Sequence, residues 1–202
     1  DEVHLATPKT QSALLEAMEE HQVTAEGETR RLPEPFFVIA TQNPSHQIGT
    51  FALPESQLDR FLMRIELGYP GREAERSLLA GGNTRERLDT LPATLSPAEL
   101  KPLQQAAAGV HAAPALIDYV QALVEETRRD PAFAHGLSPR AALALLAAAR
   151  AWAFIDGRDM VLPEDVQAVF PAVAAHRLPR SQGAGHAGPE EIAALVRRTP
   201  LP

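Results

Sequence analysis

Three short stretches of this sequence carry side chains that could act on a phosphate group. An acidic pair stands first, Asp1-Glu2; Asn43 follows the apolar run 36–41; and Arg60 comes a short loop later. A carboxylate pair, an amide and a guanidinium are the groups that a nucleoside-triphosphate hydrolase places around its γ-phosphate. The sequence therefore predicts the γ-phosphate side of such a hydrolase.

The phosphate-binding loop of these enzymes does not occur in this sequence. No G-x-x-x-x-G-K-[ST] stretch is found, and the backbone N–H groups of that loop normally hold the phosphates. We therefore expect the chain to be the second half of an ATPase and to be inactive by itself.

Composition narrows the class of protein and its partners. The 202 residues are 45% hydrophobic, enough for one or two domains with a core, and 19 Lys+Arg against 26 Asp+Glu give a net charge of −7. Nucleic-acid binding normally shows as a basic excess, so this balance argues against a dominant role of that kind. With no cysteine, no signal-like start and no apolar run of membrane-spanning length, we expect a cytoplasmic protein without disulfides.

The first eighty residues mix helix and strand signals. A Thr-Pro cap and apolar spacing predict a first helix that ends at Glu20, and β-branched arms around a central Gly predict a hairpin at 22–32. The apolar run 36–41 predicts a strand buried on both faces of a parallel sheet, and 61–67 predicts a further strand. With a helix at 72–80, these signals predict an α/β core.

Beyond residue 82 the pattern becomes helical. A polar, turn-rich linker is expected at 83–95 and an all-α domain at 96–178. Pro-containing caps and apolar spacing predict helices at 96–110, 115–129, 138–155 and 162–175. The Gly-rich stretch that follows predicts a flexible tail at 179–202, with a last short helix at 189–198. The α/β core that precedes the linker is assigned to residues 1–82.

The order and spacing of these fragments resemble the MoxR family of AAA+ ATPases over nearly all of residues 1–178. The matching runs are Asp1-Glu2, Pro8 to Glu20 (PKTQSALLEAMEE), Gln22 to Thr24 (QVT), Phe37 to Pro44 (FVIATQNP), Leu53 to Phe61 (LPESQLDRF), Gly68 to Pro70 (GYP), Ser138 to Ala141 (SPRA) and Asp156 to Asp159 (DGRD). His4-Leu5 departs from the Asn-Arg expected in the family. The resemblance implies the C-terminal part of a P-loop AAA+ core with a parallel sheet, from Walker B onward, followed by a helical-bundle lid.

The resemblance also implies a role for each candidate residue, with ATP and Mg²⁺ as ligands. Asp1 would hold Mg²⁺, in part through water, and Glu2 would be the general base that acts on the attacking water. Asn43 matches sensor 1, and Arg60 matches the arginine finger that acts on a neighbouring subunit's γ-phosphate. Arg140, the second residue of a capped helix, matches sensor 2.

Each assignment has a simpler structural alternative. The acidic pair could be a solvated terminus, and Asn43 could serve turn chemistry with the proline after it. Both arginines could form ordinary ion pairs: Arg60 with Asp59 or Glu55, and Arg140 with Asp156 or Glu125. The hairpin resembles the insertion before sensor 1 that would push on a client in a ring pore, or it is an ordinary surface hairpin.

The resemblance finally implies ATP hydrolysis coupled to closure of the lid, which would remodel a client protein or help to insert its metal cofactor. An arginine that acts between subunits requires an oligomer, and the family implies a homo-oligomeric ring, commonly a hexamer. A von Willebrand factor A-domain protein is one candidate partner. Two other classes stay open: a non-catalytic adaptor or oligomerisation module, and a DNA-associated AAA+ motor, which salt-dependent DNA binding would favour.

Overall fold

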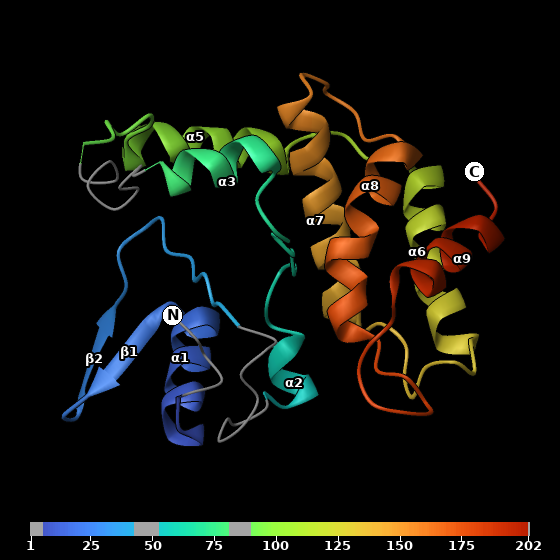
Figure 1. Ribbon diagram of the computed structural model, residues 1–202, viewed down its shortest axis with the longest axis horizontal. Helices are drawn as coiled ribbons and strands as arrows, with labels where there is room; N and C mark the ends of the chain where they lie inside the picture. The colour runs from blue at the N-terminus through green and yellow to red at the C-terminus, as the bar shows by residue number, and fades with distance from the viewer. Residues whose placement is uncertain (1–5, 43–52, 81–89, 202) are drawn as a thin grey trace.

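A computed structural model describes residues 6–42, 53–80 and 90–201 of the chain. Helix α1 (Pro8–Glu20) and the hairpin of β1 (Gln22–Ala25) and β2 (Glu28–Arg31) lie on one side of the molecule, and a helical bundle lies on the other (Figure 1). The remaining elements are α2 (Glu55–Leu58), α3 (Arg72–Leu79), α5 (Pro97–Ala108), α6 (Pro114–Arg129), α7 (Pro139–Ile155), α8 (Pro163–Ala174), the 3-10 helix η2 (Ala175–Arg177) and α9 (Pro189–Arg198).

The first helix and the hairpin form where the sequence predicts them. Thr7 caps α1, since its hydroxyl accepts the backbone N–H of Thr10 at 3.4 Å. The hairpin is antiparallel, and its two-residue turn at Glu26 and Gly27 has φ values of 54° and 82°. Positive φ at both turn residues matches the right-handed twist of the two strands. Both predictions are confirmed.

The hydrophobic core lies in the bundle. The main buried cluster of the described residues falls between Val110 and Leu195. Helix α6 buries the face that its apolar spacing predicts, namely Leu116, Tyr119, Val120, Leu123 and Val124. Helix α7 packs against α5, α6 and α8. Its Leu145 is fully buried, whereas Leu143, on another face of the same helix, is 71% exposed.

Local hydrogen bonds fix the start of α5 and the connection between α7 and α8. At the start of α5, the backbone N–H of Ser96 donates to the Glu99 carboxylate at 2.8 Å, which completes the predicted capping box and lowers the pKa of Glu99. Between α7 and α8, Arg158 donates two hydrogen bonds to the buried Asp165 carboxylate, at 2.5 and 2.6 Å. Asp165 also accepts the N–H of Leu162 at 2.8 Å. Arg158, from the Asp-Gly-Arg-Asp run, therefore joins two helices.

The strands predicted at 36–41 and 61–67 are not formed. Both segments are irregular, and the sheet of the described residues is the β1–β2 hairpin alone. None of their side chains is buried, and the exposed fractions reach 74% for Ile39 and 90% for Leu67. A parallel strand exists only through hydrogen bonds to neighbouring strands. The described residues place no such strand beside either segment.

The segment after residue 178 is more ordered than the predicted flexible tail. Helix α9 forms at the predicted residues and packs against α6 and α8, with Ile192 and Leu195 buried. The backbone N–H of Ala187 donates to the carbonyl of Leu178 at 2.8 Å, which holds the intervening loop closed. The burial of apolar side chains, which the Gly-rich composition does not reveal, attaches this segment to the bundle.

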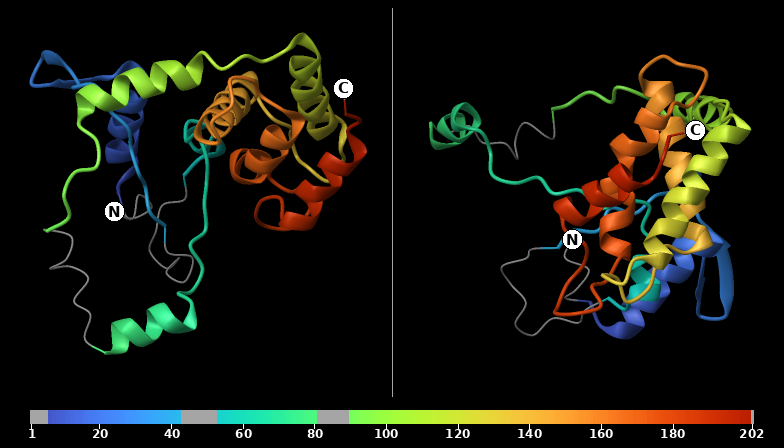
Figure 2. Two further views of the ribbon diagram at one scale, coloured as in Figure 1. Left: turned by 90° about the horizontal axis from the view of Figure 1, so that it is seen from above. Right: turned by 90° about the vertical axis from the view of Figure 1, so that its right-hand side faces the viewer.

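Helix α3 behaves differently from the rest. It buries no residue, and Figure 2 shows it standing clear of both α5 and the bundle. Its sequence is amphipathic, with Leu78 and Leu79 exposed. Every helix in the described ranges is too short or too polar to cross a bilayer.

The core assignment predicts unequal effects of two leucine truncations on α7. Leu145→Ala should lower the free energy of unfolding by about 2–5 kcal/mol, because it removes buried methyl groups and leaves a cavity. Leu143→Ala, the matched exposed control, should change it by less than about 0.5 kcal/mol. Denaturant titration of both variants measures this difference, and equal losses would contradict the packing of α7.

Candidate functional site

The structure describes two of the predicted site residues. Arg60 and Arg140 fall within the described ranges, whereas Asp1, Glu2 and Asn43 lie outside them. The roles predicted for the acidic pair and for the asparagine therefore stay predictions. The geometry of the site is built from the two arginines and the elements that hold them.

Arg60 and Arg140 meet at a single carboxylate, that of Glu19. Glu19 lies in the last turn of α1, Arg60 follows α2, and Arg140 is the second residue of α7. Nη1 of Arg60 contacts one carboxylate oxygen of Glu19, and Nη2 of Arg140 contacts the other. The exposed fractions of the three side chains are 30%, 45% and 38% for Arg60, Arg140 and Glu19. Two cations from distant parts of the sequence thus face one partly open position.

The loop that carries Arg60 is held by the buried guanidinium of Arg177, in η2. Its Nε donates to the Asp59 carboxylate at 2.9 Å, and its other nitrogens donate to the carbonyls of Asp59, Phe61, Leu62 and Val173. These bonds use all five N–H donors of a guanidinium. Burial lowers the pKa of Arg177, and Asp59 opposes that shift. The loop is therefore fixed to the bundle by a satisfied buried charge.

A second bond joins the same loop to the start of α7. The Ser138 hydroxyl donates to the Asp59 carboxylate at 2.9 Å and accepts the N–H of Ala141 at 3.0 Å as the cap of α7. Asp59 precedes Arg60, and Ser138 lies two residues before Arg140. This single bond therefore brings the backbones that carry the two arginines together. The sequence did not single out Asp59, Ser138 or Arg177 for this role.

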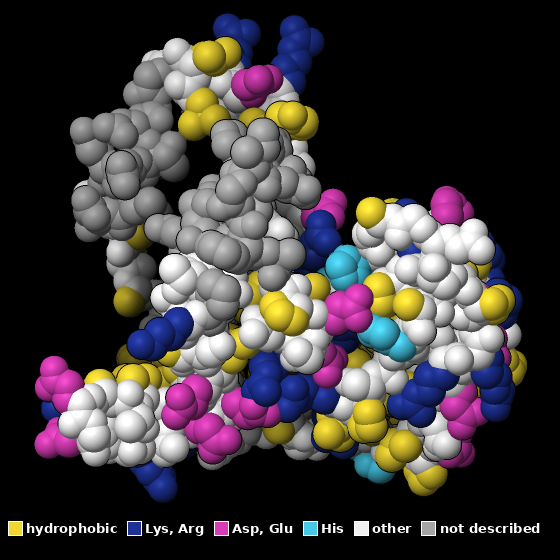
Figure 3. All heavy atoms as spheres, turned by 90° about the horizontal axis from the view of Figure 1, so that it is seen from below, with side chains coloured by type: hydrophobic (Ala, Val, Ile, Leu, Met, Phe, Trp, Pro, Cys, Tyr) yellow, Lys and Arg dark blue, Asp and Glu magenta, His cyan; other side chains and the backbone are white. Residues whose placement is uncertain are grey.

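Further contacts extend the junction between the loop and the bundle. Glu55, in α2, pairs with Nε2 of His135, and the N–H of Arg64 donates to the Ala172 carbonyl at 2.9 Å. Figure 3 shows two His side chains flanking an acidic side chain where the two parts of the molecule meet. Desolvation lowers the pKa of His186 at this junction, and the Glu55 carboxylate opposes the shift. The segment from Glu55 to Arg64, which carries Arg60, therefore contacts the bundle near both of its ends.

These contacts also settle which ordinary ion pairs are present. Arg60 and Arg140 both pair with Glu19, so the ion pairs considered as alternatives to their predicted roles are not the ones formed. Those four carboxylates have other partners: Asp59 binds Arg177, Glu55 binds His135, Asp156 binds Arg158 and Glu125 binds Arg129. Asp59 and Glu55 thus bind residues that are distant in the sequence, whereas Asp156 and Glu125 bind arginines two and four residues away.

A buried histidine completes the junction. Nε2 of His176 lies 3.2 Å from the Phe61 carbonyl, and the side chain is almost fully enclosed. Desolvation, together with the nearby charge of Arg177, lowers the pKa of His176 to about 4. The imidazole is therefore neutral at pH 7, with its Nε2 proton donated to the carbonyl.

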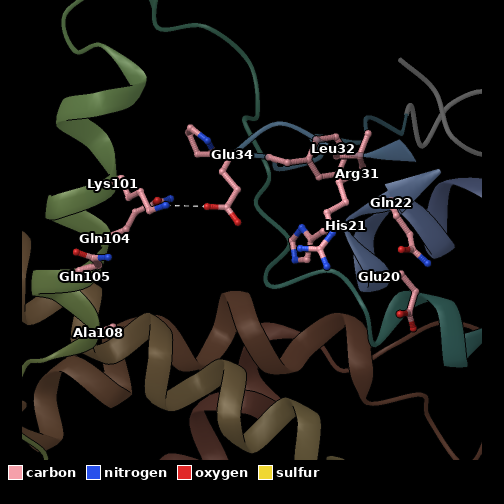
Figure 4. Close-up of a pocket in the computed structure, with 12 residues that line it drawn as sticks. Glu20, His21, Gln22, Arg31, Leu32, Glu34, Lys101, Gln104, Gln105 and Ala108 are labelled. Carbon is pink, nitrogen blue, oxygen red and sulfur yellow. Dashed lines mark hydrogen bonds and ion pairs between the residues drawn. The ribbon is translucent and has the colours of Figure 1, made fainter. Parts of the chain in front are cut away.

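Two open grooves lie beside α1. One has a volume of about 360 Å³ and is lined by Ser12, Leu15, Glu16, Glu19, Glu20, Ser56, Gln57 and Arg60. The other, of about 610 Å³, lies between the base of the hairpin and α5. Figure 4 shows Lys101 of α5 reaching across this second groove to Glu34, and the ion pair is 2.9 Å long. The first groove is the one that Arg60 and Glu19 line.

The predicted magnesium ligand is Asp1, which the structure does not describe. Within residues 6–42, 53–80 and 90–201, no group of three or more His, Asp or Glu side chains is arranged to hold a metal ion. The described residues therefore offer cations for a phosphate, and a metal site would depend on the undescribed acidic pair.

Two family models match this chain. The model of the ATPase family associated with various cellular activities (AAA) matches residues 1–63, and the model of the AAA lid domain matches residues 125–197. Arg60 falls in the first match and Arg140 in the second. The lid match also extends past residue 178 and includes most of α9.

Several proteins of known sequence are similar to the chain. Chaperone MoxR1 of Mycobacterium tuberculosis is 44% identical over 188 residues, which cover 88% of this chain and 49% of that protein. Protein YeaC of Bacillus subtilis is 42% identical over 178 residues, 88% of this chain and 56% of YeaC. MoxR of Paracoccus denitrificans is 36% identical over 198 residues, 88% of this chain and 58% of that protein. The chain thus spans about half the length of the curated relatives it matches.

A solved structure has the same fold. The crystal structure of a candidate ATPase from Cytophaga hutchinsonii superposes with a TM-score of 0.88 at 34% sequence identity. The match covers all of this chain and 65% of that one. The predicted architecture, part of an AAA+ core followed by a helical lid, is therefore confirmed.

The burial of His176 predicts a pH dependence of stability. Its pKa is about 4 in the folded protein and 6.5 when exposed, so the unfolded chain binds the proton more readily. The contribution of neutral His176 to the free energy of unfolding is fully present above about pH 6.5 and is lost as the pH falls toward 4. At pH 4.5 the free energy of unfolding should be lower by about 2–3 kcal/mol. Denaturant titrations at about pH 7.5 and 4.5 measure this loss.

Two histidine variants separate this effect from the titration of other groups. His176→Gln removes the titrating group, so it should show a smaller loss on acidification than the wild type. His111→Gln, at an exposed position, should keep the wild-type loss. Equal losses in the wild type and in His176→Gln would contradict the assignment.

Proposed function

Since this chain belongs to the MoxR family of AAA+ ATPases, we propose that it supplies the γ-phosphate side and the lid of an ATP-hydrolysing motor. The observation that carries this proposal is the convergence of Arg60 and Arg140, one from each family match, on one carboxylate. Guanidinium groups bind phosphate through several N–H donors and stabilise the charge that develops during phosphoryl transfer. The pair is thus suited to a γ-phosphate.

The remaining chemical roles rest on the sequence. Glu2 acts as the general base on the attacking water, and Asn43, which follows the apolar run 36–41, orients that water. Asp1 holds Mg²⁺, which would neutralise phosphate charge when bound with ATP. The P-loop lies outside these residues, so hydrolysis requires it to be supplied by the rest of the protein.

Arg60 and Arg140 act on one phosphate in this proposal, because they face one position of the same surface. Arg60 works as a finger on the nucleotide of a neighbouring subunit, which requires self-association, and a ring closes such head-to-tail contacts. We place Arg140 beside it on that phosphate. The lid then senses the nucleotide across the subunit interface.

The work done with ATP is remodelling of a client protein, or insertion of its metal cofactor. The Mycobacterium tuberculosis relative is named a chaperone, which supports the first role. The hairpin β1–β2 projects from the molecule with its strands exposed (Figure 1), as an element that pushes on a client would. A von Willebrand factor A-domain protein is the partner class to test first.

Replacement of the base should separate binding of ATP from its hydrolysis. In the protein as its host produces it, Glu2→Gln should bind ATP as the wild type does but lower turnover by at least about a hundredfold, since it removes the group that activates water. Nucleotide-binding titration and phosphate release measure the two effects. Glu26→Gln, in the hairpin turn, is the charge-matched control, and normal turnover in Glu2→Gln would exclude Glu2 as the base.

Replacement of the finger should affect a neighbouring subunit. Arg60→Ala should lower turnover by about a hundredfold or more, because a guanidinium on the γ-phosphate is lost. Arg129→Ala, at a 71% exposed position of the lid, should leave turnover unchanged. Phosphate release measured for both variants tests the assignment, and an Arg60→Ala rate equal to that of Arg129→Ala would refute it.

A further inference from the structure

We propose that Glu19 is a positioning residue, which holds Arg60 and Arg140 together as a paired cation before a phosphate reaches them. The inference rests on the proposed function and adds a residue to it. Its observation is geometric: each oxygen of the Glu19 carboxylate contacts a different guanidinium, one from the loop after α2 and one from the start of α7. A single carboxylate thus bridges two parts of the chain.

Without this carboxylate the two arginines would repel each other. Like charges that are only partly screened favour separation, and both side chains are long and partly exposed. Arg177 lies close enough that the charge of Arg140 helps to lower its pKa. The nearby carboxylate of Asp59 is already used by Arg177 and Ser138. Glu19 is the carboxylate that neutralises the other two guanidiniums.

The bridge leaves the arginines able to bind an anion. In the contacts of the described residues, Glu19 is reached by Nη1 of Arg60 and by Nη2 of Arg140. A guanidinium has five N–H donors on three nitrogens, so each arginine keeps donors for phosphate oxygens. Glu19 therefore need not leave when a phosphate binds, and it sets the spacing of the two side chains. Such preorganisation lowers the barrier without requiring movement in the reaction.

Glu16 provides a matched control for Glu19. It lies on α1 one turn earlier and lines the same groove. Among the described residues it forms no ion pair. Glu16→Gln and Glu19→Gln therefore remove the same charge from the same helix and groove, but only the second removes the bridge.

The first test compares these variants in the protein as its host produces it. Glu19→Gln should lower the turnover number for ATP about tenfold and change KM less than twofold, because the arginines act on the transition state more than on bound ATP. Glu16→Gln should keep both values. A Glu19→Gln subunit that unfolds or fails to assemble would show a structural role and overturn the proposal.

Mixed assemblies distinguish positioning from a structural role. Subunits with Glu2→Gln cannot hydrolyse ATP but still offer their arginines to a wild-type neighbour. Adding Glu2→Gln/Glu19→Gln subunits to wild type should therefore inhibit more strongly than adding Glu2→Gln/Glu16→Gln subunits, with about tenfold slower turnover at the wild-type sites beside them. Identical inhibition curves would overturn the role of Glu19.

A third mixture separates failure of this inference from failure of the proposed function. Glu2→Gln/Arg60→Ala subunits should inhibit their wild-type neighbours most strongly. If they do so while Glu19→Gln has no effect, the finger stands and the role of Glu19 is refuted. If they inhibit no more than Glu2→Gln/Glu16→Gln subunits, the finger assignment itself is wrong and the role of Glu19 falls with it.

Discussion

The buried guanidinium of Arg177 is the interaction on which the placement of the candidate site depends. It binds one carboxylate and four backbone carbonyls, and three of these carbonyls belong to the loop that carries Arg60. A buried charge is tolerated only when it is paired and its remaining donors are satisfied. The loop must therefore keep its path across η2, since any other path would leave Arg177 unsatisfied. That path brings Asp59 to Ser138 and Arg60 to the start of α7.

Much of the bundle could be predicted because its signals are local. The cap of α5 needs only Ser96 and Glu99, and the buried face of α6 is visible in the spacing of its apolar residues. The strands at 36–41 and 61–67 could not be judged in this way, because a strand depends on hydrogen bonds to segments distant in the sequence. The position of the segment after residue 178 likewise depends on apolar contacts with the bundle, which its Gly-rich composition does not reveal.

The candidate site was predictable as a set of residues but not as an arrangement. Family resemblance identified Arg60 and Arg140, and the structure shows that they share Glu19, a residue of the matched α1 run without a distinct signal of its own. Arg177 did have a signal. A His-Arg pair inside the apolar run from Val169 to Leu178 is typical of a buried, hydrogen-bonded polar pair. Its partner could not be read from the sequence, because Asp59 is distant along the chain.

The anchoring of these groups divides the site between two bodies. Arg140 belongs to α7, and Arg60 is fixed to the bundle through Asp59, so both arginines are attached to the bundle. Glu19 belongs to α1, on the hairpin side of the molecule (Figure 1). A displacement of the lid relative to α1 would therefore strain the two partly exposed Glu19 contacts before the buried Arg177 contacts, because exposed ion pairs are the weaker ones. The contacts between α1 and the bundle thus include the carboxylate that holds the arginines. A change in the position of the lid relative to α1 would therefore also change the position of both arginines relative to Glu19.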